Sequence, residues 1–328
     1  MDLDLVFLGT GGSVPTARRA TAAVLLRRGG ERLLVDCGEG TQRQMQRSTG
    51  LVHLDRILIT HFHADHWLGL PGLLKTFDLQ GRERPLEIAG PRGLAQLLGT
   101  LTRLIGRVSY ELTVTELEPG DAVALEDAEV RCFPVEHRGR AIGYALVEAE
   151  RPGRFDTDAA ARLGVEPGPA FGALQRGEEV PGSDGTVRPE QVMGEQRPGR
   201  KVVITGDTAP CEMTCVAAHE ADLLVHDGSF ADEEAERARE TGHSTARQAA
   251  RLGHEAGVRF LALVHVSSRY NVSAVLEEAR QEFPAAVAPR DFDIVEIPFA
   301  ERGEPALVPN GARERPGEAA EATPAAPE

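Results

Sequence analysis

The stretch THFHADHWLGL, residues 60–70, decides the fold of this chain, because it places metal-binding side chains directly after an apolar run at 57–59. That run is typical of a buried strand. In an extended segment alternate side chains share one side, so His61, His63 and Asp65 are expected to converge. His66 can point elsewhere if the chain turns into a helix there. Two groups of ligands predict two metal ions, and imidazole with carboxylate suits Zn²⁺, with Mn²⁺ or iron also possible. A solvated histidine-rich turn is the competing interpretation, and four candidate ligands within six residues weigh against it.

Length and composition indicate a globular protein. The chain has 328 residues, 41% of them hydrophobic, which is enough for a sizeable core in one large or two small domains. We find neither a secretory signal nor an apolar run approaching the ~18 residues of a membrane span, so we expect a cytoplasmic protein without a membrane partner. The four cysteines lack a CxxC spacing and are expected to be free thiols: Cys37, Cys132, Cys211 and Cys215.

The formal net charge of −15 argues at first sight against a nucleic-acid partner, since phosphate binding is driven by lysine and arginine. The distribution of charge is uneven, however. Arginine outnumbers acidic residues over 18–47, which gives one candidate region to face phosphate. A solvated face is an equally good interpretation of the same arginines.

Strands and helices alternate through most of the chain. Apolar periodicity predicts strands at 3–8, 22–26, 32–36 and 85–89, and helices at 39–47, 67–79 and 93–105. Four strands follow up to residue 147. Further strands are expected from residues 200, 221 and 259 onward with a helix between each pair, then a helix at 272–283 and a strand at 292–297. The tail from Glu301, rich in Glu, Pro, Ala and Gly, is expected to be disordered.

Two segments stand apart from this pattern. Residues 150–199 are dense in glycine and proline and lose periodicity, which predicts an inserted arm, a long loop or a disordered linker. The glycine turn at 9–13 lacks the GxGxxG spacing of dinucleotide sites. Its glycines are instead expected to let the backbone approach the site or a phosphate.

Three more candidate ligands follow the ends of predicted strands. His137, Asp207 and His265 each lie just beyond a carboxyl end, which is where layered α/β folds gather functional side chains. Taken singly, each histidine is more often an ordinary one satisfied by the backbone. Taken together with the segment at 60–66, they predict one constellation.

The pattern HxHxDH, followed by a distant His, an Asp after a strand and a final His, resembles the metallo-β-lactamase superfamily. That resemblance implies an α/β fold, a four-layer αββα sandwich with two metals at one edge and here an inserted flexible arm. It assigns His61, His63 and His137 to one zinc and Asp65, His66 and His265 to the other. Asp207 would bridge them.

More of the chain is similar to one branch, the tRNase Z (ribonuclease Z) family. The resembling segments are LGTGGSVPTARR, DCGEGTQRQ, ITHFHADHWLGLPGLL, LGVEPGPAFGALQRGEEV, GRKVVITGDT, HDGSFA, HST and HVSSRY. The resemblance implies a zinc-dependent endoribonuclease that removes the 3′ trailer from precursor tRNA, leaving a 3′ hydroxyl on the tRNA and a 5′ phosphate on the trailer. It also implies the long-arm form, with a nuclease domain over 1–300, a tRNA-binding arm over 150–199, and a homodimer in which one subunit's arm serves the other's site.

The same resemblance assigns catalytic roles. Asp65 would accept a proton from the attacking water, and His243 would supply the acid for the departing 3′ oxygen. Thr245 and Gln248 have the spacing of a capping box, which predicts the N-terminus of a helix directly after His243. In the family a glutamate orients the matching histidine, whereas this chain has Asp227, one methylene shorter, so a less direct contact is expected.

Arg269 and Tyr270, just beyond His265, fit binding of phosphate and of a base or the backbone. A surface ion pair is the competing interpretation for Arg269. Two other function classes stay open at this point. One is a small-molecule hydrolase of the same fold, such as a phosphodiesterase, thioesterase or lactonase, which would have no use for the arm. The other is a catalytically silent RNA-binding module, which would have no reason to keep all seven ligands.

Overall fold

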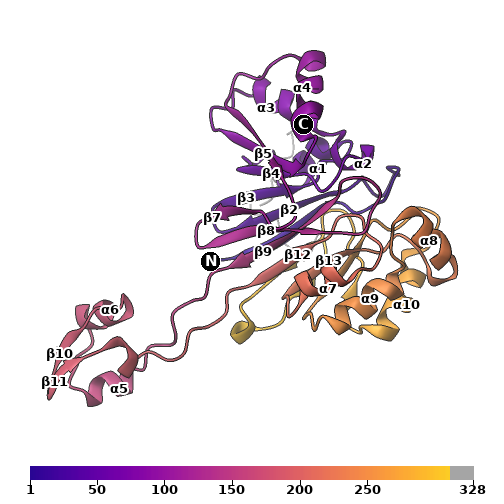
Figure 1. Ribbon diagram of the computed structural model, residues 1–328. Helices are drawn as coiled ribbons and strands as arrows, with labels where there is room; N and C mark the ends of the chain where they lie inside the picture. Colours follow the sequence, from indigo (N-terminus) through magenta and orange to yellow (C-terminus); the bar gives the residue numbers. More distant parts are fainter. Residues whose placement is uncertain (311–328) are drawn as a thin grey trace, which may run out of the picture. The chain divides into compact units, whose positions relative to one another are not determined.

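The computed structural model of the protein describes residues 1–310, which form two mixed β-sheets flanked by helices (Figure 1). The first sheet has the strand order β17-β16-β1-β2-β3-β4-β5-β6. Its strands are β1 (Leu3–Gly9), β2 (Ala23–Arg28), β3 (Glu31–Val35), β4 (Arg56–Leu58), β5 (Leu86–Pro91), β6 (Leu112–Leu117), β16 (Ile294–Glu296) and β17 (Ala306–Val308). The strands predicted over 3–8, 22–26, 32–36 and 85–89 are confirmed, and β2 and β3 form the expected antiparallel pair.

The second sheet has the order β15-β14-β13-β12-β9-β8-β7. Its strands are β7 (Ala122–Leu125), β8 (Ala128–Pro134), β9 (Ile142–Glu148), β12 (Lys201–Ile204), β13 (Leu223–Asp227), β14 (Leu261–Val264) and β15 (Ala286–Val287). Strands β12, β13, β14 and β15 are parallel. They therefore deliver their carboxyl ends to one edge, which is where the sequence places Asp207 and His265.

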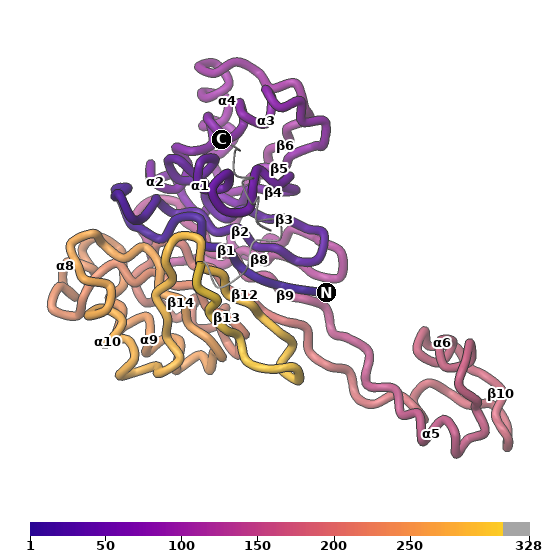
Figure 2. Tube along the Cα trace, turned by 180° about the vertical axis from the view of Figure 1, so that it is seen from behind, coloured from indigo at the N-terminus to yellow at the C-terminus, as the bar shows by residue number. Residues whose placement is uncertain are grey.

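Two groups of helices cover the sheets. Figures 1 and 2 show α1 to α4 gathered beside β4 and β5, and α8 to α10 gathered beside β13. The helices are α1 (Thr41–Arg47), α2 (Ala64–Trp67), α3 (Leu70–Leu79), α4 (Leu94–Ile105), α7 (Glu212–Ala218), α8 (Ala235–Thr241), α9 (Ala246–Glu255) and α10 (Val272–Glu282). The apolar stripe of α4 buries Leu94, Leu98 and Leu101 in a core built with the first sheet, whereas Leu104 is 77% exposed. The capping box of Thr245 and Gln248 opens α9 as predicted.

The helix predicted over 67–79 is wrong in its start, because the chain forms α2 and then α3. The break falls at Gly69, which packs so closely on the neighbouring loop that a Cβ there would lie 2.1 Å from the carbonyl oxygen of Gly38. The amide of Gly69 donates to the carbonyl of Cys37 at 2.8 Å. This close contact ties α2, which lies in the segment of candidate ligands, to the end of β3.

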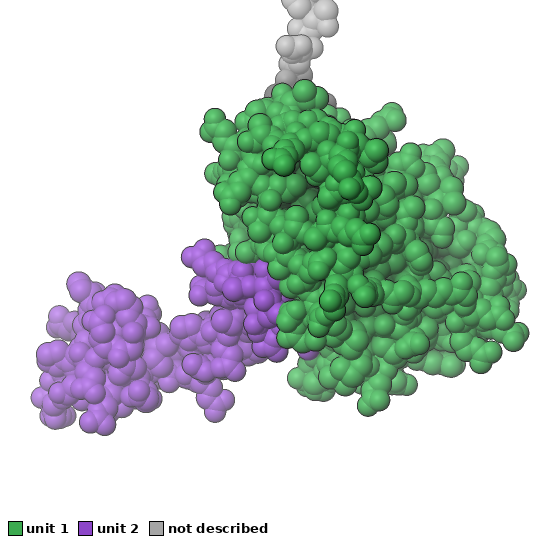
Figure 3. All heavy atoms as spheres, turned by 45° about the horizontal axis from the view of Figure 1, so that its top comes forward, with its two compact units in different colours: residues 1–121, 132–145, 202–328 green, residues 122–131, 146–201 purple. Residues whose placement is uncertain are grey.

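The chain divides into two compact units, which Figure 3 colours separately. The first comprises Met1–Asp121, Cys132–Ala145 and Val202–Glu328, and the second comprises Ala122–Arg131 and Leu146–Lys201. The second unit contains α5 (Thr157–Arg162), α6 (Pro169–Gln175) and a hairpin of β10 (Val180–Gly182) and β11 (Gly185–Val187).

The segment 150–199 is not the coreless loop or linker that its composition predicts. Its short elements enclose a small core of Ala160, Val165, Leu174, Val180, Val187 and Val192. Phe155 and Phe171 add a ring contact of 4.6 Å between centroids. The elements are too short to show a helical or strand period in the sequence, which is why periodicity missed them.

The expectation of disorder from residue 301 onward is also wrong in part. β17 pairs with β16 in antiparallel register, with Leu307 opposite Val295. The prediction missed this three-residue edge strand because it rested on the Glu, Pro, Ala and Gly content of the tail as a whole. The remainder of the predicted tail, 311–328, lies outside the described residues. Within residues 1–310, no helix combines the length and apolar character that crossing a bilayer would demand.

Candidate metal and catalytic site

The predicted site residues meet within the first unit, at the carboxyl ends of strands from both sheets. The segment after β4 is held in place by two side chains. The buried Tyr144 hydroxyl donates to the carbonyl of Ile59 at 2.7 Å, and the Trp67 indole donates to the carbonyl of Phe62 at 3.0 Å. These bonds present the imidazoles of the 61–66 segment to the residues that follow β8, β12 and β14.

One group of ligand atoms contains His61, His63, His137 and Asp207, whose atoms all lie within 4.8 Å of one another. His63 Nδ1 lies 3.0 Å from His61 Nε2 and 3.1 Å from His137 Nε2. Asp207 Oδ2 lies 3.6 Å from His61 Nε2 and 3.9 Å from His137 Nε2. Three imidazoles and one carboxylate therefore face a common point.

A second group contains Asp65, His66 and His265. His265 Nε2 lies 3.1 Å from Asp65 Oδ2, and His66 Nε2 lies 3.5 Å from the same oxygen. Asp207 reaches this group as well, at 3.4 Å from both His66 Nε2 and His265 Nε2. Asp207 therefore touches both groups.

The extended-strand argument grouped Asp65 with His61 and His63, and that grouping is wrong. The helix α2 starts at Ala64, so Asp65 lies on the helix with His66 and turns toward His265. The structure places Asp65 with His66 and His265, and His63 with His61 and His137.

The arrangement fits divalent cations on the chemistry of its atoms. Two buried polar atoms, His66 Nε2 and Asp207 Oδ1, have no hydrogen-bond partner within residues 1–310, although they face each other at 3.4 Å. Buried polar atoms without partners are costly and rare in folded proteins. A cation placed among these atoms would satisfy all of them, and imidazole with carboxylate is a suitable ligand set for zinc.

Hydrogen bonds on the far side of each ring fix the imidazole tautomers. His66 Nδ1 lies 2.7 Å from Asp36 Oδ2, and Thr60 Oγ1 contacts both Asp36 carboxylate oxygens at 2.9 and 3.1 Å. Since the Thr60 hydroxyl donates to Asp36, it accepts from His61 Nδ1 at 3.0 Å. His137 Nδ1 donates to the carbonyl of Gly242 at 2.6 Å. In all three rings the Nε2 lone pair is left for the site, as metal-binding histidines require.

The buried carboxylate of Asp227 binds several groups next to His265. Its Oδ2 lies 2.7 Å from His243 Nδ1 and accepts the amide of Thr208 at 3.1 Å. Its Oδ1 accepts the Ser229 hydroxyl at 2.6 Å. The expectation of a less direct contact from the shorter Asp side chain is therefore wrong, because the carboxylate touches His243 without an intermediary.

The glycine turn contributes backbone to the site. The amide of Ser13 donates to Asp65 Oδ2 at 2.8 Å. A Cβ on Gly12 would lie 2.6 Å from His265 Nδ1, so only glycine allows this approach. The expectation that these glycines bring backbone to the site is confirmed.

The electrostatics differ among the ligand imidazoles. For His66 and His265, burial lowers the pKa but the carboxylate of Asp207 outweighs it, so the pKa of His66 lies well above its usual value and that of His265 is raised. Burial lowers the pKa of His61 well below its usual value and lowers that of His137. Burial opposes the charge on Asp207, but the imidazoles of His265 and His66 outweigh it and hold the pKa of Asp207 well below its usual value. For His243, burial lowers the pKa while the carboxylate of Asp227 raises it, and the net result is a pKa of about 9. His243 therefore carries a proton that it can donate.

A cavity of about 220 Å³ opens beside these rings and is lined by His243, His265, Arg237 and Arg269, among others. The guanidinium of Arg269 lies 5.6 Å from the centroid of the Phe230 ring and 3.5 Å from Glu234. Arg269 thus joins the site and also makes the ion pair that was the competing interpretation. The Tyr270 hydroxyl donates to Glu234, which turns its polar end to a protein partner.

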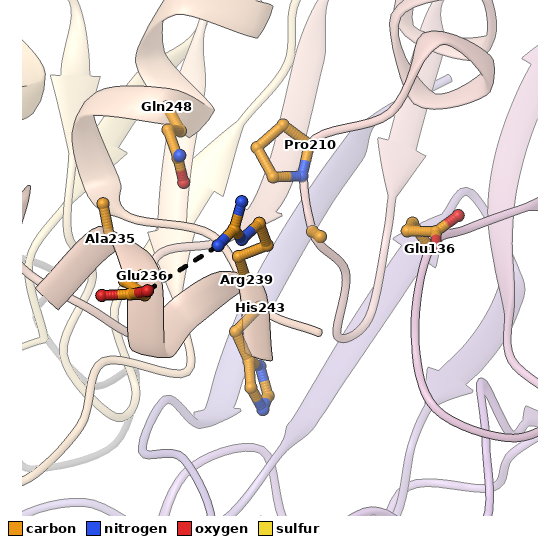
Figure 4. A pocket seen from close by; sticks show the side chains of 8 residues that line it. Glu136, Pro210, Ala235, Glu236, Arg239, His243 and Gln248 are labelled. Carbon is orange, nitrogen blue, oxygen red and sulfur yellow. Dashed lines mark ion pairs between the residues drawn. The ribbon is translucent and has the colours of Figure 1, made fainter. Parts of the chain in front are cut away.

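A larger cavity of about 620 Å³ is also lined by His243 (Figure 4). Its wall includes Pro210, Gln248 and the ion pair of Glu236 with Arg239, which are 3.9 Å apart. His243 therefore lines both cavities.

Most arginines of the 18–47 region have protein partners. Arg27 pairs with Asp4 at 2.6 Å, Arg28 pairs with Glu31 at 2.7 Å, and Arg19 donates to Thr10 Oγ1 at 2.8 Å. The region is therefore in part a structural set of ion pairs and hydrogen bonds.

Sequence reasoning missed three residues whose side chains contact the candidate ligands, namely Asp36, Thr60 and Ser229. One signal was present for two of them, since Asp36 and Thr60 follow the apolar runs of β3 and β4 just as the ligands do. No sequence pattern marked Ser229. Asp36, Ser13 and His265 have positive φ values of 58°, 60° and 61°. Such left-handed backbone in residues other than glycine often occurs at functional sites.

Comparisons with known sequences find relatives named ribonuclease Z that match most of the chain. The sequence model described as the beta-lactamase superfamily domain matches residues 31–164. Ribonuclease Z of Methanosarcina acetivorans is 49% identical over 302 residues, which cover 90% of this chain and 99% of that protein. Ribonuclease Z of Haloferax volcanii is 50% identical over 307 residues, which cover 92% of this chain and 97% of that protein. Among solved structures, the short form of human tRNase Z matches with a TM-score of 0.67 and 28% identity, covering 90% of this chain and 99% of that one.

Proposed function

This chain belongs to the ribonuclease Z family and is a metal-dependent endoribonuclease of tRNA 3′-end processing, and we propose that it removes the 3′ trailer from precursor tRNA in one cut. The cut leaves a 3′ hydroxyl on the tRNA and a 5′ phosphate on the trailer. The observation that carries the proposal is the meeting of two ligand groups on Asp207, with the proton-bearing His243 beside them.

We propose that two zinc ions occupy the two groups, with manganese as a substitute. His61, His63 and His137 would hold one ion, and Asp65, His66 and His265 the other, with Asp207 shared. The orphaned His66 Nε2 and Asp207 Oδ1 support this assignment. When bound, a pair of divalent cations acidifies water and neutralises charge on phosphate oxygens.

The chain's own residues then move the protons. Asp65 is anchored by the amide of Ser13, and it accepts a proton from the water whose oxygen forms the new bond to phosphorus. The bond from phosphorus to the 3′ oxygen of the tRNA breaks as His243 donates a proton to that oxygen. Asp227 holds His243 through Nδ1, so Nε2 is the atom that faces the leaving group. Arg269, at the cavity that His243 lines, would pair with a substrate phosphate, and the neighbouring Tyr270 with the RNA backbone or a base.

We propose that the segment 150–199 is the tRNA-binding arm of a long-arm form of the family. Its own core shows that it is built to hold a shape, which a passive connection would not need. Arg154 and Arg162 are exposed on it. Outside this arm, residues 1–300 would form the nuclease domain.

We further propose that the enzyme acts as a homodimer in the cytoplasm. The formal net charge of −15 means that attraction to RNA must come from the bound cations and local arginines. A dimer in which one subunit's arm serves the other subunit's site would pool those patches.

The proposal is tested by incubating the purified protein with a 5′-labelled precursor tRNA that carries a trailer, with zinc or manganese supplied. One cut next to the discriminator base, with a 3′ hydroxyl on the shorter product, is expected. His63→Ala serves as the control that separates this activity from a contaminating nuclease. An intact precursor after incubation with metal-loaded protein contradicts the proposal.

A further inference from the structure

The Ser229 hydroxyl lies between a buried carboxylate and a candidate metal ligand. Its Oγ is 2.6 Å from Asp227 Oδ1 and 2.8 Å from His265 Nδ1. The backbone amide of Ser229 also donates to Asp227 Oδ1, at 2.9 Å. Ser229 is only 4% exposed, so these contacts form away from bulk water.

The direction of each hydrogen bond follows from the atoms. An ionised carboxylate only accepts, so the hydroxyl proton of Ser229 points to Asp227. The lone pairs of the hydroxyl are then left for His265, whose Nδ1 must carry the hydrogen. This leaves the Nε2 lone pair of His265 facing Asp65 and Asp207, at 3.1 and 3.4 Å.

The same arrangement occurs a second time, around Asp36. There the carboxylate of Asp36 accepts from the Thr60 hydroxyl, which in turn accepts from His61 Nδ1 at 3.0 Å. Asp36 also holds a second imidazole directly, that of His66. Asp227 likewise holds a second imidazole directly, that of His243. Each buried carboxylate thus holds one ring by direct contact and another through a hydroxyl.

We propose that Ser229 is a positioning residue that fixes the tautomer of the ligand His265 and ties it to Asp227, the carboxylate that orients the acid His243. The part of this inference that concerns the acid rests on the proposed function, whereas the part that concerns the ligand does not. In consequence, Asp227 anchors both the acid His243, by direct contact, and the ligand His265, through the hydroxyl of Ser229. Loss of the hydroxyl would release His265 to rotate or to take the other tautomer, while its left-handed backbone and the close approach of Gly12 hold its main chain in place.

The test compares Ser229→Ala, which removes the hydroxyl, with Ser229→Thr, which keeps it. Thr214→Val is the matched control, because Thr214 is also buried and its hydroxyl contacts Cys211 Sγ at 3.1 Å rather than an imidazole. Zinc affinity is measured by competition with a chromogenic chelator, and kcat and KM are measured on precursor tRNA. Thermal unfolding shows that each variant is folded.

We expect Ser229→Ala to bind its more weakly held zinc about 10- to 100-fold less tightly, the usual effect of losing a partner of a metal-binding histidine. Its kcat should fall while KM changes little. Ser229→Thr and Thr214→Val should both stay near wild type in zinc affinity. Ser229→Gly, which also lacks the hydroxyl, replaces the alanine variant if that protein does not fold.

A folded Ser229→Ala protein with wild-type zinc affinity overturns the inference, and so does a folded Ser229→Thr protein that is as defective as Ser229→Ala. The proposed function fails separately, if wild-type protein leaves precursor tRNA intact. The comparison of zinc affinities among the variants holds in that case as well, so the two failures are distinguishable.

Discussion

The carboxylate of Asp227 lies 2.7 Å from the Nδ1 atom of His243, across the 16 residues that separate them in the chain. The contact is direct although Asp is one methylene shorter than the glutamate of the family pattern. Asp227 can reach because it ends β13 inside the core, fully buried, and because the amides of Thr208 and Ser229 hold its two oxygens. The orientation of His243 is therefore set by a carboxylate that cannot itself rotate.

Asp227→Asn is predicted to lower kcat on precursor tRNA by about 100-fold or more, the scale of a general acid that is no longer held and charged correctly. KM should change little, because Asp227 is buried and touches no substrate. Single-turnover cleavage measures the effect. Asp222→Asn, at an Asp just before β13 that pairs with Arg259 at 2.6 Å, is the control and should keep near wild-type kcat. An unchanged kcat in a folded Asp227→Asn protein would show that His243 does not depend on this contact.

Removal of the arm is predicted to separate RNA binding from chemistry. The backbone amide of Arg151 donates to the carbonyl of Arg197 at 2.8 Å, and the amide of Arg197 donates to the carbonyl of Arg151 at 2.9 Å. Because these two residues lie side by side, a short Gly-Ser linker can replace residues 154–195, which lie between them in the chain. The arm has its own core, and the seven ligand residues all lie in the other unit. The variant should therefore lose binding of precursor tRNA in a gel-shift assay and keep hydrolysis of a small phosphodiester.

The same deletion decides between two function classes. An enzyme whose substrate is a small molecule would have no use for the arm, so its deletion would change neither the hydrolysis of a small phosphodiester nor the affinity for precursor tRNA. Wild-type precursor affinity in the deletion variant contradicts the role proposed for 150–199.

Arg269 is predicted to make one phosphate contact. Arg269→Ala should weaken binding of precursor tRNA and reduce the slope of log affinity against log salt by about 1, as expected when one phosphate contact is lost. Fluorescence anisotropy between 50 and 200 mM salt, about the range over which such slopes are measured, provides the data. Arg131→Ala removes an exposed arginine that pairs with Glu129 in the β7–β8 hairpin, and it should leave the slope unchanged. An identical slope for Arg269→Ala and wild type would assign Arg269 to its ion pair with Glu234 alone.

Thiol labelling tests the burial of the core. Cys37 and Cys132 are 0% and 4% exposed, and burial raises the pKa of each thiol to about 12. Only the thiolate reacts, so both should be protected at pH 8 and should react faster as the pH rises toward 12. Cys211 and Cys215 are only partly buried and should label first. Mass spectrometry of peptides gives the order, and rapid labelling of Cys37 in the native protein would contradict the packing of β3.

The sequence predicted the segment of candidate ligands at 60–66 and most strands of both sheets, although not β15 and β17, because these features depend on local pattern. Apolar runs mark β4, β12 and β14, and each is followed by a ligand residue, so position in the chain predicted position at the sheet edge. The sequence pattern gave a wrong prediction where the chain turns sharply from an extended segment into a helix. The start of α2 at Ala64 moves Asp65 to the second ligand group, and the alternation of an extended strand could not anticipate that turn.

Contacts between distant segments could not be predicted in the same way. Ser229 and His265 are 36 residues apart, and Asp36 and His66 are 30 apart. Nothing in the composition of either segment reveals that they touch. The small core of the arm was missed for a related reason: elements of three to seven residues are too short to display a period.

Metal analysis of the purified protein is the most direct test of the central claim, that Asp207 joins two groups of ligands into one site for a pair of divalent ions. After incubation with zinc and removal of excess metal, elemental analysis should find about two zinc ions per chain. The variant Asp207→Ala, verified as folded by circular dichroism, should hold fewer. A folded wild-type protein that retains no zinc, or an Asp207→Ala variant that retains two ions as tightly as wild type, would contradict this account.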